Sequence, residues 1–177
     1  KTDNARIKIK MKKDFENVLK KGCSLFASKK QKQLLTYHPF DTNNVCCFFD
    51  SKFMFGLDGF DIVIGNPPWG QKSVKFSESE KKYFKKVYPL ATEGILDIFR
   101  LFVERAINLL NYNGSFAYVL PDIILLKNYD STRKFILDNL LMTRIDHWGM
   151  AFENVNLESC TLIGKKSLEK IKKNNVV

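Results

Sequence analysis

Apolar residues recur at helical spacing in two stretches of the chain. Near the N-terminus they interrupt a polar segment every three or four residues, which predicts an amphipathic helix ending near Gly22. The members of this stripe are Ile7, Met11, Phe15, Val18 and Leu19. The same spacing over residues 97–110 predicts the strongest helix of the chain, which Asn113-Gly114 is expected to end.

Short apolar runs bounded by turn residues predict strands. The first covers residues 60–65 after a glycine-containing turn, and the second covers 115–120 directly after the long helix. Residues 142–147 and 159–164 are candidates for the final strands. A strand followed by a helix and a second strand returns to a parallel sheet by a right-handed crossover. The pattern therefore predicts an α/β fold with a mostly parallel sheet and flanking helices.

Cap residues predict two shorter helices. Ser77-Glu78-Ser79-Glu80 is a capping box, and it predicts a helix that continues through Val87. Asp130 or Ser131 is expected to cap a further helix through Leu140. Two segments without periodicity are expected to form loops: 31–44 and 70–76.

Length and composition predict a soluble, intracellular protein. The chain has 177 residues, of which 45% are hydrophobic, so it can bury the core of one compact domain or of a large part of one. No apolar run is long enough to cross a bilayer, and residues 1–13 lack the apolar segment that follows the charged start of a signal peptide. The cysteine spacings match neither a zinc knuckle nor a redox pair. We therefore expect free thiols in a reducing compartment, the cytoplasm: Cys23, Cys46, Cys47 and Cys160.

The chain is strongly basic, with a formal charge of +10 and a pI near 9.4. Such a charge suits a surface that binds a polyanion. A bias toward lysine and asparagine across the whole sequence explains the excess equally well, and both explanations stay open. The same holds for the local clusters at Lys8–Lys13, Lys29–Lys32 and Lys81–Lys86, which either contact phosphates or form solvated helix faces.

A rigid turn follows the first predicted strand. The apolar run Ile62-Val63-Ile64 leads through Gly65 into Asn66-Pro67-Pro68-Trp69. Two consecutive prolines fix φ and cannot donate backbone hydrogen bonds to a sheet, so the strand has to end in a stiff, extended turn. This turn presents the Asn66 side chain, and the Trp69 ring offers a face on which a flat group can stack, a contact worth ~1–3 kcal/mol for a nucleobase.

The turn contains groups that can activate a planar amine. An amino group on a heteroaromatic ring is a weak nucleophile because its lone pair is delocalised, and acceptors placed at its two N–H groups redirect that pair. The Asn66 carboxamide oxygen can be one acceptor, and the Pro67 carbonyl can be the other. Plain Asn-Pro turns are common. The strand, both prolines and Trp69 together nevertheless favour methyl transfer onto a planar amino group.

At this turn and beyond it the chain resembles amino-group DNA methyltransferases, above all the adenine-specific, Eco57I-like and type IIG-like enzymes of restriction-modification systems. In these enzymes methylase and endonuclease often share one long chain. The catalytic motif of the family is matched by FDIVIGNPPWG. The helix and strand that follow it are matched by EGILDIFRLFVERAINLLNYNGSFAYVLPDIIL, and the next segments by STRKFILDNL and AFENVNLESCTLIG. The resemblance covers roughly positions 40–166.

The resemblance implies part of a class I, Rossmann-like methyltransferase fold, with S-adenosyl-L-methionine as cofactor and double-stranded DNA as substrate. It assigns the catalytic roles to Asn66, Pro67 and Trp69, with Trp69 also holding an extruded adenine. It places Phe152 on the side of the base opposite Trp69, although core packing is an equal explanation for this phenylalanine. No metal and no covalent nucleophile are required. His147 and Trp148 are alternative residues for lining the pocket.

The resemblance also assigns three residues to the cofactor: Asp50, Pro68 and Phe102. Asp50 lies where an acidic residue of the family meets the amino group of the cofactor's adenine, and Phe102 lies where a ring packs against that adenine. Structural interpretations stay open for both. Asp50 can cap a turn, and a phenylalanine on one face of a helix is usually a core residue.

Three segments are expected: a helix and connector at 1–44, the catalytic half of a methyltransferase domain at 45–166 and a lysine-rich tail at 167–177. The chain has no Gly-x-Gly turn of the kind that passes beneath the cofactor's amino-acid end. We therefore expect a fragment, or one piece of a split or longer methylase-nuclease chain. Two alternatives remain: methylation of a release-factor glutamine amide or of cytosine amino groups, and a non-catalytic scaffold that binds DNA or a partner chain.

Overall fold

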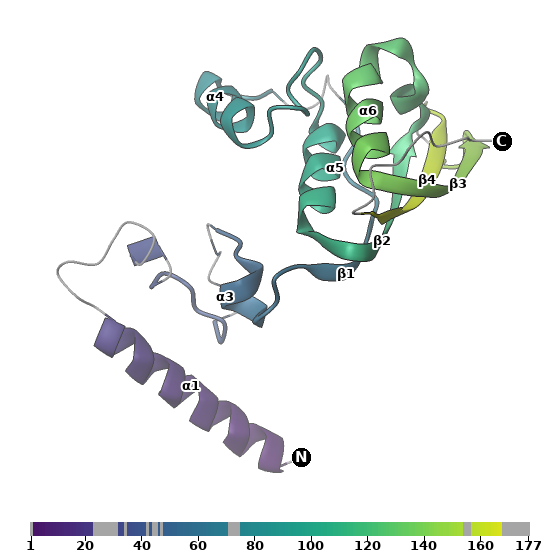
Figure 1. Cartoon of the computed structure of the whole chain (residues 1–177). Helices are drawn as coiled ribbons and strands as arrows, with labels where there is room; N and C mark the ends of the chain where they lie inside the picture. The colour runs from purple at the N-terminus through teal and green to yellow at the C-terminus, as the bar shows by residue number, and fades with distance from the viewer. Residues whose placement is uncertain are drawn as a thin grey trace. The chain divides into compact units, whose positions relative to one another are not determined.

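The chain forms two compact units, residues 1–55 and 56–177, in a computed structural model (Figure 1). The boundary between them falls inside the segment 45–166 that the sequence assigns to one catalytic half. The structure describes residues 2–22, 32–33, 35–41, 43, 46, 48–70, 75–153 and 157–167. Most of the predicted C-terminal tail and two of the cysteines, Cys23 and Cys47, lie outside this described part.

Unit 1 begins with a long helix, as predicted. Helix α1 covers Thr2–Gly22, and most of the apolar side chains along it are exposed. Phe15 differs, because its ring lies edge-on to the rings of Tyr37 and Phe40, at centroid distances of 6.3 and 6.0 Å. The short helix α3 (Ser51–Phe55) ends the unit. Aromatic contacts of this kind join α1 to the connector that follows it.

The described part of unit 2 is built on a mixed sheet of four strands. They are β1 (Phe60–Gly65), β2 (Leu110–Pro121), β3 (Leu140–Gly149) and β4 (Ser159–Lys166). The strands lie in the order β1-β2-β4-β3. β1 pairs with β2 in parallel, as predicted, whereas β4 is antiparallel to both of its neighbours. The α/β class is confirmed. The sheet is not mostly parallel as expected, because the short β3–β4 connection turns the chain back as an antiparallel hairpin.

Three α-helices lie between these strands. They are α4 (Glu78–Val87), α5 (Ile98–Leu109) and α6 (Asp130–Asn139), with the short 3-10 turns η1 (Asp122–Leu125) and η2 (Lys127–Tyr129) before α6. The predicted capping box of α4 is confirmed: the Ser77 hydroxyl accepts from the Glu80 N–H, and the Glu80 carboxylate accepts from the Ser77 N–H at 2.7 Å. None of the helices in the described part of the chain combines the length and hydrophobicity that a membrane crossing requires.

The predicted boundary between the long helix and its strand is wrong. α5 ends at Leu109, and β2 begins at Leu110 and runs through Asn113-Gly114 instead of starting after it. Leu110 is buried and pairs with Phe60 of β1, so tertiary packing overrides the helix-ending signal. A Cβ on Gly114 would lie 3.0 Å from the Phe60 carbonyl oxygen. The glycine therefore serves the close approach of β1 and β2 rather than a helix end.

The start of α6 is held by Arg100 instead of by the predicted caps. Tyr129 is the N-cap residue and makes no side-chain capping bond. Arg100 Nε donates to Thr132 Oγ1 at 2.6 Å, and its Nη2 donates to Ser131 Oγ at 3.0 Å. Asp130 instead pairs with Arg133 at 3.1 Å. The hydroxyls of the first turn are thus acceptors for a buried guanidinium.

Arg100 also binds the segment that leads into α5. Its guanidinium donates to the backbone carbonyls of Leu90, Glu93 and Ile95. The side chain is fully buried, and this burial lowers the pKa of Arg100, partly offset by nearby groups that include Tyr129 and Asp97. The Glu104 carboxylate accepts from the Ala91 N–H at 2.7 Å, and burial raises its pKa. Two buried charges therefore hold residues 90–95 against the helices.

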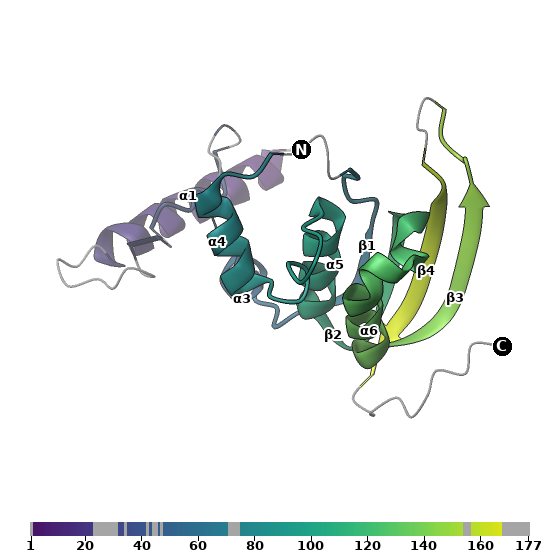
Figure 2. The ribbon, with the colours of Figure 1, turned by 90° about the horizontal axis from the view of Figure 1, so that it is seen from above.

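The core lies on one face of the sheet, where α5 and α6 pack side by side (Figure 2). Its members include residues of both helices and of strands β2 and β4: Phe99, Val103, Ile107, Ile136, Phe116, Leu120 and Leu162. On β1, Val63 packs against this core, whereas Ile62 and Ile64 point to the other face and are 66% and 72% exposed. β1 therefore contributes only one of its two faces to the core.

Candidate active site

Three strands end at one edge of the sheet. β1 is parallel to β2, and β4 runs against both β2 and β3, so β1, β2 and β3 share one direction. The turn 66–69 follows β1, Asp122 follows β2, and Phe152 lies in the β3–β4 connection. The carboxyl ends of parallel strands are where open α/β sheets bind their ligands. Residues far apart in the sequence therefore meet at this edge.

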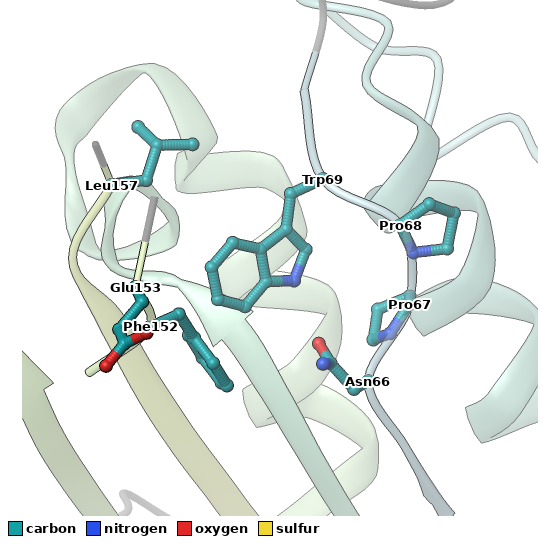
Figure 3. Close-up of a pocket in the computed structure, with 7 residues that line it drawn as sticks. All are labelled: Asn66, Pro67, Pro68, Trp69, Phe152, Glu153 and Leu157. Carbon is teal, nitrogen blue, oxygen red and sulfur yellow. The ribbon is translucent and has the colours of Figure 1, made fainter. Parts of the chain in front are cut away.

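A cavity of about 540 Å³ opens here, a volume within the range of small-molecule sites. Its lining residues are Asn66, Pro67, Pro68, Trp69, Phe152, Glu153 and Leu157. Figure 3 shows the Asn66 carboxamide, the Trp69 indole and the Phe152 ring turned toward a common space. The structure thus brings together the turn and the distant phenylalanine that the sequence singled out.

The two aromatic rings of the cavity touch each other. Trp69 and Phe152 are edge to face, with centroids 5.5 Å apart and planes at 74°. The pair is attractive in this arrangement. A flat group can enter between the rings only if they separate. Trp69 Nε1 is buried and has no hydrogen-bond partner in the described part of the chain, so the indole keeps an unused donor beside the turn.

Local geometry explains why β1 ends with a glycine, directly before the turn. Gly65 pairs with Tyr118 of β2, and a Cβ on Gly65 would lie 3.1 Å from the tyrosine ring. A larger residue would push the ring out of the core or force β1 away from β2. Pro67 is buried after it, and Gly70 closes the turn with a φ of 111°, which L side chains rarely adopt. The strand end and both sides of the turn are therefore constrained.

The three residues assigned to the cofactor do not line one cavity. Pro68 is exposed and lines the 540 Å³ cavity. Phe102 on α5 lines a separate apolar cavity of about 210 Å³ together with aromatic residues of α4, and it is 43% exposed, so it is not a core residue. Asp50 belongs to unit 1, where its carboxylate accepts from the Phe53 N–H at 2.9 Å and caps α3. That bond is the structural role the sequence left open for Asp50.

Two lining residues were not expected from the sequence. Glu153 and Leu157 line the cavity because they belong to the β3–β4 connection that also carries Phe152. No motif or periodicity distinguishes them. Glu153 adds a carboxylate to an otherwise mostly apolar lining, so the site contains a second side-chain acceptor besides Asn66.

A polar cluster lies at the same edge of the sheet. His147 Nε2 is 3.2 Å from Glu158 Oε2 and 3.9 Å from Asp122 Oδ2. Ligand atoms of these three residues lie within 4.8 Å of one another, close enough to hold a metal ion. Exposed ion pairs with this geometry are common without one. His147 and Trp148 are not among the described lining residues of the cavity, and Trp148 Nε1 donates to Thr161 Oγ1 at 2.8 Å.

One cysteine lies buried near this edge. Cys160 on β4 is fully buried, and burial together with the Asp122 carboxylate raises the pKa of its thiol to about 11. Cys46 is half-buried. The two cysteines in the described part of the chain are both free, as predicted.

Comparison with protein families and curated proteins gives consistent matches. The family model described as Eco57I restriction-modification methylase matches residues 1–152. The type II restriction enzyme and methyltransferase RM.Eco57I of Escherichia coli is 27% identical over 142 residues, which cover 77% of this chain and 13% of that protein. The adenine-specific methyltransferase BrxX of Escherichia coli O9:H4 (strain HS) is 32% identical over 92 residues, which cover 51% of this chain and 7% of that protein. The chain therefore spans a small part of the length of these relatives.

Comparison with solved structures shows the fold. A crystal structure from Listeria monocytogenes, described as a class I S-adenosylmethionine-dependent methyltransferase, matches with a TM-score of 0.54 at 22% identity. The match covers 68% of this chain and 36% of that one. The described sheet and helices of unit 2 thus form part of a class I methyltransferase fold.

Proposed function

The chain belongs to the Eco57I restriction-modification methylase family, and we propose that it forms the target-base pocket of an enzyme that methylates the exocyclic amino group of adenine in DNA. The proposal rests above all on the cavity in which Asn66, Pro67 and Trp69 face Phe152. BrxX is an adenine-specific methyltransferase, which supports adenine as the target. RM.Eco57I is both restriction enzyme and methyltransferase, so a nuclease in the same longer protein is part of the proposal.

The target base has to leave the double helix to reach this pocket. The amino group of a stacked and paired adenine is not accessible, so the nucleotide is extruded. Trp69 and Phe152 then hold the ring from two sides. Their present contact at 5.5 Å gives way to stacking on the base, which contributes ~1–3 kcal/mol per aromatic contact. The same stacking suits a planar heterocycle better than a flexible amide, which favours DNA over a glutamine side chain.

Asn66 and Pro67 prepare the amine for attack. The Asn66 carboxamide oxygen and the Pro67 carbonyl accept the two amine hydrogens, so the nitrogen lone pair turns out of the ring plane. As the nitrogen–carbon bond forms, the bond between that carbon and the leaving sulfur would break, with its electron pair left on the sulfur. The nitrogen gains positive charge in this step, and the two oxygens stabilise that charge before one proton passes to water. S-adenosyl-L-methionine supplies, when bound, a methyl carbon attached to a positively charged sulfur.

The residues proposed for the cofactor have suitable chemistry. Phe102 presents a ring that is 43% exposed on a helix whose other apolar residues are mainly buried, and such a ring can stack on a purine. Pro68 follows Asn66 by two residues and lines the same cavity. Asp50 is proposed to accept a hydrogen bond from the amino group of the cofactor's adenine.

The test is Asn66→Ala in the protein that contains this chain. Loss of one of two acceptors that act in the transition state is expected to reduce methyl transfer by about 10²–10³-fold, with DNA binding retained. Incorporation of labelled methyl groups into DNA measures the rate, and mass spectrometry of the digested DNA identifies the methylated nucleoside. Asn128→Ala is the matched control, because Asn128 is an exposed asparagine of η2 in the same unit.

Three results would contradict the proposal. Methylation by Asn66→Ala within a few-fold of the wild type would show that this acceptor does not act in the reaction. Methylcytosine or a methylated glutamine as the product would assign the pocket to another substrate. Wild-type protein that binds DNA and the cofactor but transfers no methyl group would be a scaffold.

A further inference from the structure

Helix α4 has a basic face. Its last two turns contain four exposed lysines at i, i+4 spacing, which places them on one side of the helix: Lys81, Lys82, Lys85 and Lys86. Lys81 is paired with Glu78 at 2.7 Å. The other three have no ion-pair partner among the residues that the structure describes. Three positive charges on one turn and a half are therefore available to a ligand.

The opposite side of α4 is aromatic and attaches the helix to the body of unit 2. Phe84 and Tyr88 line the 210 Å³ cavity with Phe102, and Phe84 is 5.1 Å from the ring of Phe76. α4 buries none of its own residues completely. In both ribbon views α4 stands on the outer side of α5, away from the sheet (Figures 1 and 2). α4 is thus amphipathic: its aromatic side chains Phe84 and Tyr88 face the rest of unit 2, and its lysines face solvent.

The chain connection keeps α4 near the proposed base pocket. Ser77, the N-cap of α4, follows Trp69 by eight positions, so a fully extended chain would place it at most about 29 Å away. A helix of 10 residues is itself about 15 Å long. A duplex with one base in the cavity extends for tens of ångströms on both sides. Phosphates a few nucleotides from the extruded base therefore fall within the reach of α4.

We propose that the lysine face of α4, formed by Lys82, Lys85 and Lys86, binds the phosphate backbone of the DNA beside the extruded base. The inference rests on the proposed function and adds to it a surface that positions the duplex. Lysine and phosphate are complementary in charge, and such contacts fix the register of a protein on DNA without reading its sequence. The aromatic attachment gives these charges a defined place in unit 2.

The salt dependence of DNA binding tests this assignment. Each phosphate contact contributes about 0.9 to the slope of log K against log salt concentration, so three contacts contribute about 2.7. Between 50 and 200 mM salt, the affinity of the triple variant Lys82→Gln/Lys85→Gln/Lys86→Gln is expected to fall about 40-fold less than that of the wild type. Fluorescence anisotropy with labelled duplex DNA measures both slopes. Glutamine is a good helix former, and circular dichroism checks that α4 is retained.

The matched control is Lys8→Gln/Lys10→Gln/Lys12→Gln, which removes the same charge from exposed positions of α1 in unit 1. A smaller slope in the α4 variant alone, restored by arginine at the same three positions, supports the inference. Equal slopes in all proteins, or equal reductions in both triple variants, would refute it, because total charge would then explain binding. Unchanged slopes with full methylation would overturn the inference and leave the proposed function intact. Absence of DNA binding by the wild type would overturn both.

Discussion

Replacing Arg100 by methionine is expected to destabilise unit 2 severely. The substitution removes donors from five acceptors: the carbonyls of Leu90, Glu93 and Ile95 and the hydroxyls of Ser131 and Thr132. A buried acceptor left without a donor costs ~1–3 kcal/mol. The acceptors near the surface regain water, and the methionine avoids the cost of burying a charge. A net loss of about 3–5 kcal/mol remains, which is the usual cost of breaking a buried charge network.

Urea unfolding measures this loss. A domain of this size has a stability of roughly 5–15 kcal/mol, so Arg100→Met should remove a large part of it. With a slope of about 2 kcal/mol per M urea, the unfolding midpoint should fall by about 2 M. Arg144→Met is the matched control, because the Arg144 side chain is 65% exposed and pairs with Asp146, two residues away. Its expected loss is below ~1 kcal/mol.

A lysine at the same position separates charge from geometry. Arg100→Lys keeps the positive charge, but a single ammonium cannot reach acceptors on both the 90–95 segment and α6. Its loss should lie between those of the methionine variant and the control. If Arg100→Met unfolded within ~1 kcal/mol of the wild type, the hydrogen bonds of the guanidinium would not be what holds this segment, and the reasoning would be wrong.

Two further predictions concern Cys160 and Trp69. With a pKa of about 11, only about one Cys160 side chain in a thousand is a thiolate at pH 8. The rate at which Cys160 is alkylated in the folded protein should therefore be very low at this pH and rise about tenfold per pH unit toward pH 11. Because burial favours the neutral thiol, the stability that the buried thiol contributes is present below pH ~9 and is lost as the pH rises through about 11. Peptide mass spectrometry measures the alkylation of Cys160. An alkylation rate that levels off near pH 9 would contradict the burial argument. In a Trp148→Phe background Trp69 is the only tryptophan, and Phe152→Ala should shift its emission to longer wavelength because the edge-to-face contact is lost. The control Leu141→Ala, at an exposed apolar residue of β3, should leave the Trp69 emission unchanged. Unchanged emission in Phe152→Ala would show that the Trp69 and Phe152 rings do not touch in solution.

The sequence correctly predicted those helices and strands whose formation depends on residues close together in the chain. The capping box at Ser77 and the strand before Asn66 have their causes within a few residues, and both were found where the sequence placed them. The start of β2 was mispredicted: the strand begins at Leu110 instead of Ser115, because Leu110 is buried and pairs with Phe60 of β1.

The residues of the candidate site also differ in how far the sequence alone could identify them. The four residues of the turn are contiguous, so the sequence alone singled them out, and the structure places all four along one cavity. Phe152 was identified through resemblance to a family, and the structure places it in the cavity. Glu153 and the Asp122, His147 and Glu158 cluster depend on how β2, β3 and β4 align, which no local pattern encodes.

The exposed side of β1 has a consequence for how the chain behaves at high concentration. β1 is an edge strand of the described sheet, and Ile62 and Ile64 present an apolar surface on it. Such an edge is a template on which the strand of another molecule can add. Asp61 is the one charged residue within the strand, and its carboxylate accepts from Asn111 at the surface. Asp61 thus places a charge on the edge strand that leads into the turn 66–69, and a charge at such an edge disfavours the addition of another strand.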